Sequence, residues 1–402
     1  MKRTALLILS LILAATLVGA QSRHRGIPSL PFARPDRNEI RYPAGESEDF
    51  DYFLRRLDTL LMTGRGNVRI VQIGGSHVQG GTWTSQLRRN LMSLRYGMDG
   101  GRGFVFPYSA AATNTPTGYY TSYTGQWESS RCIKPEMRMG VSGIAVSTAD
   151  PDATFAVDLA ERDRAAWSPA FMFKDVDILG YGDLEPVLLM EKDTVRGTFD
   201  GRLWRYSLPH FVEWISVGFT GFPGRYTVKG MYLDRPSTGL TVSEIGVNGA
   251  ATSSFLRCED FEEDLSLLAP DLVIFSLGIN DIQGTEFNPD RFASNYGRLI
   301  NAVRRVNPRC AILLTSVNDS WRRYEANPFG ALEAKALEDI AREQKAALWD
   351  LFDIMGGYGS MASWQEAGLT ANDKIHFNKE GYTVLGNLMF NALMEKLDER
   401  TR

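Results

Sequence analysis

The sequence predicts an α/β fold that is built around a parallel sheet and interrupted by an all-β domain. Apolar strands alternate with amphipathic helices over residues 47–106 and again over 241–402. This alternation is typical of a parallel sheet with helices on both faces. Between the two parts, residues 107–240 contain short runs of β-branched and aromatic residues separated by turn residues. Their spacing predicts an inserted β-sandwich.

The α/β elements follow one another in a regular order. Each expected strand is a short apolar run bounded by turn residues, and each expected helix repeats apolar residues at intervals of three and four. In chain order we expect a helix at 46–61, a strand at 68–73, a helix at 83–94, a strand at 241–247, a helix at 259–268, a strand at 271–277, a helix at 289–306, a strand at 310–317, a helix at 330–345, a strand at 347–352 and a helix at 378–397.

The N-terminal residues 1–20 have the features of a secretory signal peptide. Lys2 and Arg3 precede an apolar run, and Val18-Gly19-Ala20 offers a small-residue cleavage site. The apolar run is shorter than the ~20 residues of a membrane span. We therefore expect a secreted bacterial protein, periplasmic or extracellular, with no stable membrane anchor after cleavage. Residues 21–46 are rich in proline without apolar periodicity, which predicts a linker.

Composition and charge argue against several classes of function. A formal net charge of −4 gives no support for nucleic-acid binding, which favours a strongly basic face. The cysteines Cys132, Cys258 and Cys310 lack the paired spacing of a zinc site or a disulfide scaffold. Buried thiols are the favoured interpretation, and a single bridge remains open. The four histidines show no metal-ligand spacing, so we expect no catalytic metal and no cofactor.

The first candidate site residue is Ser76. The strand at 68–73 ends at Gly74-Gly75, and an amphipathic helix follows. Open α/β sheets bind ligands at the carboxyl ends of their strands, so the hydroxyl of Ser76 is placed to act as a nucleophile. Backbone N–H groups at a helix N-terminus also suit an oxyanion. By itself, however, Ser76 has the simpler interpretation of a helix cap.

Three further polar stretches are expected at the same edge of the sheet. They are Asn248-Gly249, Gly278-Ile279-Asn280-Asp281 and Asp373-Lys374-Ile375-His376. His376 is a candidate base for the Ser76 hydroxyl, and Asp373 would fix the tautomer of the imidazole. The Ser76 N–H, the Gly249 N–H and the Asn280 amide would together form an oxyanion hole. Each residue alone could be a turn or a cap, but their occurrence in this order favours an active site.

The four blocks, beginning with Gly74-Gly75-Ser76-His77, resemble those of the SGNH (GDSL-like) hydrolase family. The resemblance implies a three-layer flavodoxin-like fold, Ser76 as nucleophile, His376 with Asp373 as base and orienting group, and an oxyanion hole of Ser76, Gly249 and Asn280. Gly75 stands where the family often has Asp. Gly143 competes with Gly249 for the second block. We favour Gly249, because it follows a strand and precedes a helix that leads to the Asn280 strand.

The β-rich insertion makes the chain similar to secreted bacterial carbohydrate O-acetylesterases, including peptidoglycan O-acetylesterases with an inserted carbohydrate-binding-like jelly roll. This implies a serine esterase that removes acetyl groups from a polysaccharide or peptidoglycan through an acetyl-enzyme on Ser76. A polysaccharide O-acetyltransferase with the same residues and a non-catalytic glycan-binding protein remain alternatives. Aromatic residues of the insertion could stack on sugars, although core packing is favoured for most of them. They are Tyr119, Tyr120, Trp127, Trp167, Trp204 and Trp214.

Overall fold

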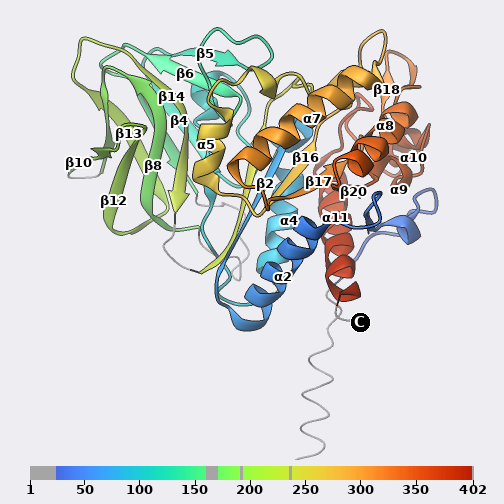
Figure 1. Cartoon of the computed structure of the whole chain (residues 1–402). Coiled ribbons are helices and arrows are strands. Elements are labelled where there is room, and N and C mark those ends of the chain that lie inside the picture. The colour runs from blue at the N-terminus through green and yellow to red at the C-terminus, as the bar shows by residue number, and fades with distance from the viewer. Residues whose placement is uncertain (1–23, 160–170, 191–192, 235–237, 401–402) are drawn as a thin grey trace, which may run out of the picture.

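The computed structural model of the chain describes residues 24–159, 171–190, 193–234 and 238–400 (Figure 1). An α/β domain and a β-rich domain lie side by side. The expected signal peptide at residues 1–20 and its cleavage site lie outside the described ranges. Within those ranges, no helix combines the length and the apolar character that crossing a membrane requires.

The central sheet has the strand order β1-β20-β17-β16-β2-β15. All neighbouring pairs are parallel except β1 with β20. Numbered by their appearance in the chain, the parallel strands lie in the order 2-1-3-4-5, which is flavodoxin-like and confirms the predicted fold. The strands are β1 (Ile40–Arg41), β2 (Asn67–Gly74), β15 (Gly239–Gly246), β16 (Leu272–Ser276), β17 (Ala311–Thr315) and β20 (Ala347–Trp349).

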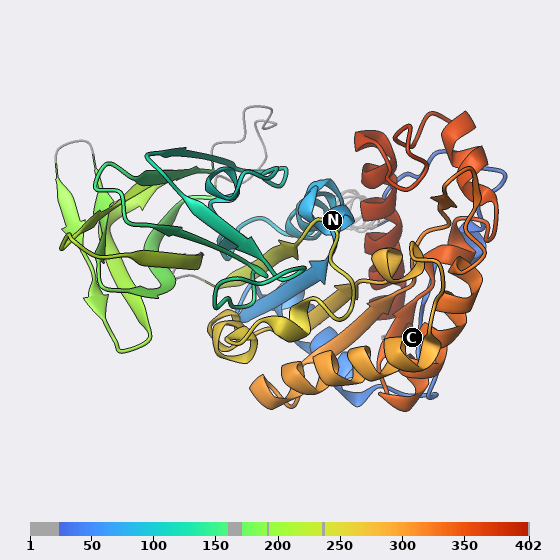
Figure 2. The ribbon, with the colours of Figure 1, turned by 90° about the horizontal axis from the view of Figure 1, so that it is seen from above.

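Helices cover both faces of this sheet. Figure 2 shows α4 (Thr82–Met92) and α11 (Lys379–Glu399) on one side and α7 (Pro289–Val306) on the other. The helix α7 packs between α5 (Phe261–Leu268) and α8 (Gly330–Glu343). Its start follows from sequence, because the Asn288 side chain accepts a hydrogen bond from the Arg291 N–H at 2.8 Å and Pro289 takes the first position.

The N-terminal segment corrects one expectation. Residues 24–46 are not a free linker but lie against the α/β domain. Ile40 is buried and pairs with Trp349 on β20, and the Arg25 backbone N–H donates to Asn391 Oδ1 at 2.7 Å. The prolines of this segment prevent a long helix or strand and remove the periodicity that sequence analysis relies on. Its scattered apolar side chains, Ile27, Leu30, Phe32 and Ala33, nevertheless pack against the core.

The β-rich domain consists of two antiparallel sheets. Their orders are β10-β9-β13-β7-β4 and β11-β12-β8-β14-β6-β5, with β3 also paired to β14. They face each other: the Tyr206 hydroxyl donates to the carbonyl of Pro186 at 2.5 Å, and the Phe219 and Tyr226 rings are 5.5 Å apart. The strands are β3 (Gly103–Val105), β4 (Tyr120–Thr124), β5 (Glu128–Arg131), β6 (Ile144–Thr148), β7 (Thr154–Asp158), β8 (Phe173–Gly182), β9 (Glu185–Leu189), β10 (Thr194–Arg196), β11 (Thr198–Phe199), β12 (Leu203–Val212), β13 (Trp214–Thr220) and β14 (Tyr226–Asp234).

The helix α2 and a set of short elements complete the chain. The helix α2 precedes β2, and most of the others lie in the loops at the carboxyl ends of the strands of the central sheet. They are η1 (Pro35–Arg37), α2 (Glu48–Thr63), α3 (Ser76–Gln79), η2 (Tyr108–Ala111), η3 (Phe255–Arg257), α6 (Ile279–Ile282), β18 (Trp321–Arg322), β19 (Glu325–Ala326), α9 (Leu351–Ile354) and α10 (Ser360–Glu366).

A buried ion cluster joins the two domains. Lys229 on β14 donates to Asp260 at 2.7 Å and to Asp264 on α5 at 2.9 Å, and all three residues are buried. The guanidinium of Arg138 also contacts Asp260, at 2.5 Å. A buried charge without a partner is costly. Moving β14 away from α5 would leave these charges unpaired, so the cluster holds the two elements in one relative position.

A second buried cluster predicts a large effect on stability. Glu244 on β15 pairs with both Arg88 and Arg102, and all three side chains are buried. Glu244→Ala removes the buried carboxylate that the two guanidinium groups share, so we expect it to lower the free energy of unfolding by about 3–5 kcal/mol. Urea unfolding measures this. Glu262→Ala, which removes an exposed partner of Arg305, is the matched control and should cost less than ~1 kcal/mol. Equal losses would contradict the prediction.

Candidate active site

Ser76 lies where the strand order of the sheet reverses. It begins α3, directly after the end of β2 and next to β16, which is the switch point at which open α/β sheets bind ligands. Gly74 makes the turn possible, because a Cβ there would lie 2.3 Å from Val78 Cγ2 and 2.7 Å from the Ser276 carbonyl. As the first helical residue, Ser76 keeps its N–H free of intrahelical bonds.

The structure brings Ser76, His376 and Asp373 together. Ser76 Oγ is 2.7 Å from His376 Nε2, and His376 Nδ1 is 2.6 Å from Asp373 Oδ2. With an ionised Asp373 accepting from Nδ1–H, the lone pair of Nε2 faces the serine hydroxyl. This is the geometry that a serine nucleophile and its base require.

Hydrogen bonds hold the loop that carries His376. Asp373 Oδ1 accepts from the backbone N–H groups of Ile375 and His376, both at 2.9 Å. The Asn318 side chain donates to the Ile375 carbonyl at 2.9 Å, and the Lys374 ammonium lies 3.5 Å from the centre of the Trp321 ring. These contacts fix the direction of the imidazole before any substrate binds.

The same contacts keep Asp373 ionised. Burial opposes ionisation, but the two backbone N–H groups and the His376 imidazole outweigh it and lower the pKa of the Asp373 carboxyl. The side chains of Asp373 and His376 are nevertheless 47% and 33% exposed. The triad therefore lies at an open surface that a large substrate can approach.

The two loops that carry the expected oxyanion residues Gly249 and Asn280 meet at the backbone just before Ser76. The loop after β15 is held by a hydrogen bond from the Val247 N–H to the Gly74 carbonyl at 3.1 Å. Gly249 in this loop has φ +80°, a conformation that favours glycine. Asn280 donates to the Ala250 carbonyl at 3.0 Å, and its Nδ2 would be 3.3 Å from a Cβ placed on Gly75. The Asn280 amide thus lies next to the backbone that precedes the serine.

Gly143, which competes with Gly249 for the second block, is explained by close packing. A Cβ on it would lie 2.8 Å from Val247 Cγ2 and 3.0 Å from Phe255 Cε1. Gly143 therefore allows the β-rich domain to approach the loop after β15. Gly249 instead lies on the exposed side of that loop.

Two supporting residues were not expected from sequence. Gln79 is fully buried, and its Oε1 accepts from the Asn248 N–H at 2.6 Å, which positions the Gly249 loop. Asp281 accepts from the N–H and the hydroxyl of Thr252 at 3.0 and 2.7 Å, which ties the Asn280 segment to the same loop. Asp281 belonged to a recognised block but had no assigned role. Nothing in the sequence identifies Gln79, because a sequence does not distinguish a buried glutamine on a helix from an exposed one.

The buried side chain of His77 packs against the imidazole of His376. Its ring stacks on that of His376 with centroids 4.8 Å apart, and its Nδ1 is 2.8 Å from the Tyr382 hydroxyl. Burial, followed by the neighbouring His376, lowers the pKa of His77 to about 3. His77 is therefore a neutral support at physiological pH.

This burial predicts acid sensitivity. The unfolded chain protonates His77 below pH ~6.5, whereas the folded protein does so only near pH 3. Stability therefore falls as pH falls through this window, by ~1.4 kcal/mol per pH unit. In urea unfolding, the wild type should lose about 2 kcal/mol more than His77→Gln between pH 6.5 and pH 5. Exposed His210→Gln is the control and should behave as the wild type. An unchanged pH dependence in His77→Gln would contradict this.

Comparisons with known proteins relate part of the chain to ester-hydrolysing enzymes. Residues 217–384 match the sequence model of the GDSL-like lipase/acylhydrolase family. The chain carries a GDSL-like acylhydrolase domain. The matched part of this domain includes Gly249, Asn280, Asp373 and His376, whereas Ser76 lies before the β-rich insertion and outside the match. The match supports an ester-hydrolysing enzyme.

A solved structure shares its fold with most of this chain. A peptidoglycan O-acetylesterase is 21% identical, with a TM-score of 0.73 over 90% of this chain and 99% of its own. Smaller matches are an acetyl xylan esterase (20% identity, TM-score 0.31, 38% of this chain and 81% of its own) and a putative acylhydrolase from Bacteroides fragilis (23%, 0.32, 39% and 76%). No curated protein is similar to this chain in sequence.

The aromatic residues of the insertion differ in their exposure to solvent. Tyr119 is buried, and Trp127 and Trp204 are partly buried against the core. Tyr120 and Trp214 are 43% and 42% exposed. Trp167 lies outside the described residues. Among the residues that the structure does describe, no group of three His, Cys, Asp or Glu side chains is placed to hold a metal ion.

Proposed function

We propose that this protein is a secreted serine esterase that removes O-acetyl groups from a polysaccharide or peptidoglycan. The observation that carries the proposal is the hydrogen bond of 2.7 Å between Ser76 Oγ and His376 Nε2, with the imidazole held from its other side by Asp373. A hydroxyl so placed loses its proton to the imidazole as it attacks a carbonyl carbon.

The reaction would proceed through an acetyl-enzyme. Ser76 Oγ attacks the ester carbonyl while His376 takes its proton, and the N–H groups of Ser76, Gly249 and Asn280 stabilise the oxyanion. Collapse of the tetrahedral intermediate expels the sugar oxygen, which receives the proton from His376. Water then attacks the acetyl group on Ser76, with His376 again as base, and acetate leaves.

Four observations support the substrate class. The triad lies at an exposed surface, which suits an ester on a polymer. The β-rich domain stands beside the GDSL-like domain, and a protein of similar fold over 90% of this chain is a peptidoglycan O-acetylesterase. The signal-peptide features of residues 1–20 fit an enzyme that works outside the cytoplasm, where such polymers are found.

Release of acetate from O-acetylated peptidoglycan tests the proposal. We expect the protein to release acetate from it, and to release none from the same material after chemical de-O-acetylation. Acetylated xylan, assayed in parallel, reports on other acetylated polysaccharides. Transfer of acetyl groups to added sugar in preference to water would instead identify an O-acetyltransferase. Glycan binding with no turnover of any acetyl ester would overturn the esterase and favour a non-catalytic binding protein.

A further inference from the structure

Two of the three cysteines lie next to each other across the boundary between the domains. Cys132 follows β5 of the β-rich domain, and Cys258 follows η3 of the α/β domain. Both side chains are buried as free thiols. Arg257, the neighbour of Cys258, donates to the carbonyl of Cys132 at 3.2 Å. A second contact comes through Gly143, where a Cβ would lie 3.0 Å from both Cys132 Sγ and Phe255 Cε1.

The surrounding backbone holds each cysteine firmly. The Cys132 N–H donates to the Gly143 carbonyl at 2.8 Å, and the Cys258 N–H donates to the Phe255 carbonyl at 3.1 Å. The Gly143 position touches both Phe255 and the Cys132 sulfur, and the thiols of Cys132 and Cys258 are themselves within hydrogen-bond reach of each other. We propose that Cys132 and Cys258 form a disulfide that links the β-rich domain to the α/β domain.

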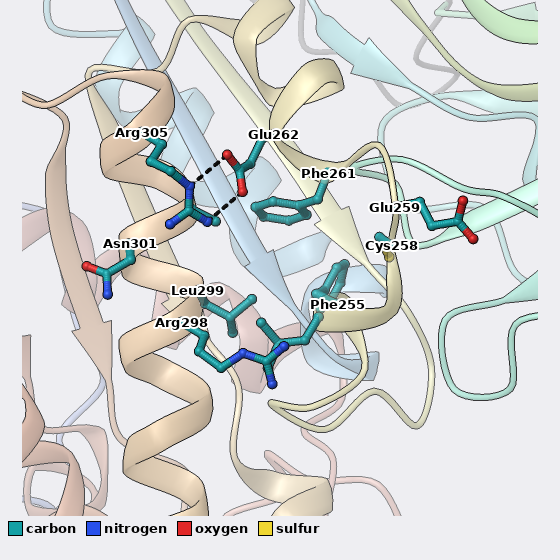
Figure 3. A pocket seen from close by; sticks show the side chains of 11 residues that line it. Phe255, Cys258, Glu259, Phe261, Glu262, Arg298, Leu299, Asn301 and Arg305 are labelled. Atoms are coloured by element: carbon teal, nitrogen blue, oxygen red, sulfur yellow. Dashed lines mark hydrogen bonds and ion pairs between the residues drawn. The ribbon is translucent and has the colours of Figure 1, made fainter.

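One member of the pair lies next to a pocket. Cys258 lines a pocket of about 350 Å³ between the η3–α5 segment and α7 (Figure 3). Phe255 and Phe261 lie between the two walls, and Arg305 pairs with Glu262 at one side. Cys258 is 6% exposed, whereas Cys132 is completely buried. Attack on an external reagent should therefore begin at Cys258.

The chemistry is thiol–disulfide exchange with a small disulfide such as oxidised glutathione. The Cys258 thiolate attacks one sulfur of the reagent, forms a mixed disulfide and releases one thiol. The Cys132 thiolate then attacks the Cys258 sulfur and releases the second thiol. The protein loses two electrons and two protons, which reduce the external disulfide to two thiols. The neighbouring Cys132 thiol and then burial raise the pKa of Cys258, so exchange should be slow in the folded protein and faster at higher pH.

Thiol counting and peptide mapping test the bridge. The reduced chain is refolded with reduced and oxidised glutathione at pH 8.5. The folded chain is exposed to the same buffer for comparison, and the bridge should form more slowly there. The refolded wild type should keep one free thiol of three and yield a Cys132–Cys258 peptide that reducing agent separates. Cys310→Ala should form the same peptide and keep no thiol. Three free thiols in the refolded wild type, or a bridge to Cys310, would overturn the proposal.

Two further measurements keep the result interpretable if one variant folds poorly. Cys132→Ala should retain glutathione on Cys258, because no thiol remains to release it, while Cys258→Ala should retain none on Cys132. The bridged wild type should also unfold at a higher urea concentration than its reduced form, because the bridge closes the long loop from Cys132 to Cys258 in the unfolded chain. Glutathione found equally on all three cysteines would argue against a selective pair.

Discussion

Ser76→Ala should lower kcat for the hydrolysis of an aryl acetate by on the order of 10⁴-fold or more. The reason is geometric: the oxygen that lies 2.7 Å from His376 Nε2 is the only atom removed. Without it no acetyl-enzyme can form, and only the slower direct attack of water on the bound ester remains. His376→Ala should cause a loss of similar size, and the double variant should be no worse, because the two groups act as one unit.

Steady-state kinetics on an aryl acetate and acetate release from O-acetylated peptidoglycan measure this loss. The matched control is Ser122→Ala, which removes an exposed hydroxyl on β4 and should leave kcat unchanged. The thermal midpoint of Ser76→Ala should stay close to that of the wild type, since the serine is only half-buried. A Ser76→Ala protein that still turns over the ester at a tenth of the wild-type rate would exclude Ser76 as the nucleophile.

The central sheet was predictable because its strands carry a strong local signal. Leu272–Ser276 and Ala311–Thr315 are short apolar runs between turn residues, which is the composition that burial on both faces of a sheet favours. The site was predictable for a related reason. Residues that end parallel strands must share one edge of the sheet, so Ser76 and Asn280 were expected together. His376, 300 positions after Ser76, was placed by the order of the motifs and not by any local pattern.

Other features depend on contacts that no sequence pattern encodes. The proline-rich residues 24–46 gave no periodicity, yet Ile40 completes the edge of the sheet beside Trp349. The role of Gln79 rests on one hydrogen bond to the Asn248 backbone, which forms only when two distant loops meet. Glu244 resembles any polar residue in a strand until the structure places two guanidinium groups against it. In each case the partner is remote in the chain, and tertiary contacts override the local signal.

Asn280→Ala should lower kcat for ester hydrolysis by about 10²–10³-fold with little change in KM. The amide of Asn280 donates one N–H to the Ala250 carbonyl at 3.0 Å. Its second N–H lies beside the backbone of Gly75. A donor there meets negative charge only after Ser76 attacks the ester, so its loss raises the barrier without weakening substrate binding. The N–H groups of Ser76 and Gly249 remain, and activity should therefore stay above that of Ser76→Ala.

The isosteric variant Asn280→Asp separates this role from a purely structural one. A carboxylate fills the same volume but has no N–H to donate, and its charge opposes the oxyanion, so we expect a loss at least as large as for alanine. Asn301→Ala, on the exposed side of α7, is the matched control and should retain wild-type kinetics. If Asn280→Ala raised KM and left kcat unchanged, Asn280 would contact the bound ester but would not stabilise the transition state. If kcat fell together with the thermal midpoint, the role of Asn280 would be limited to holding the loop that contains Ala250.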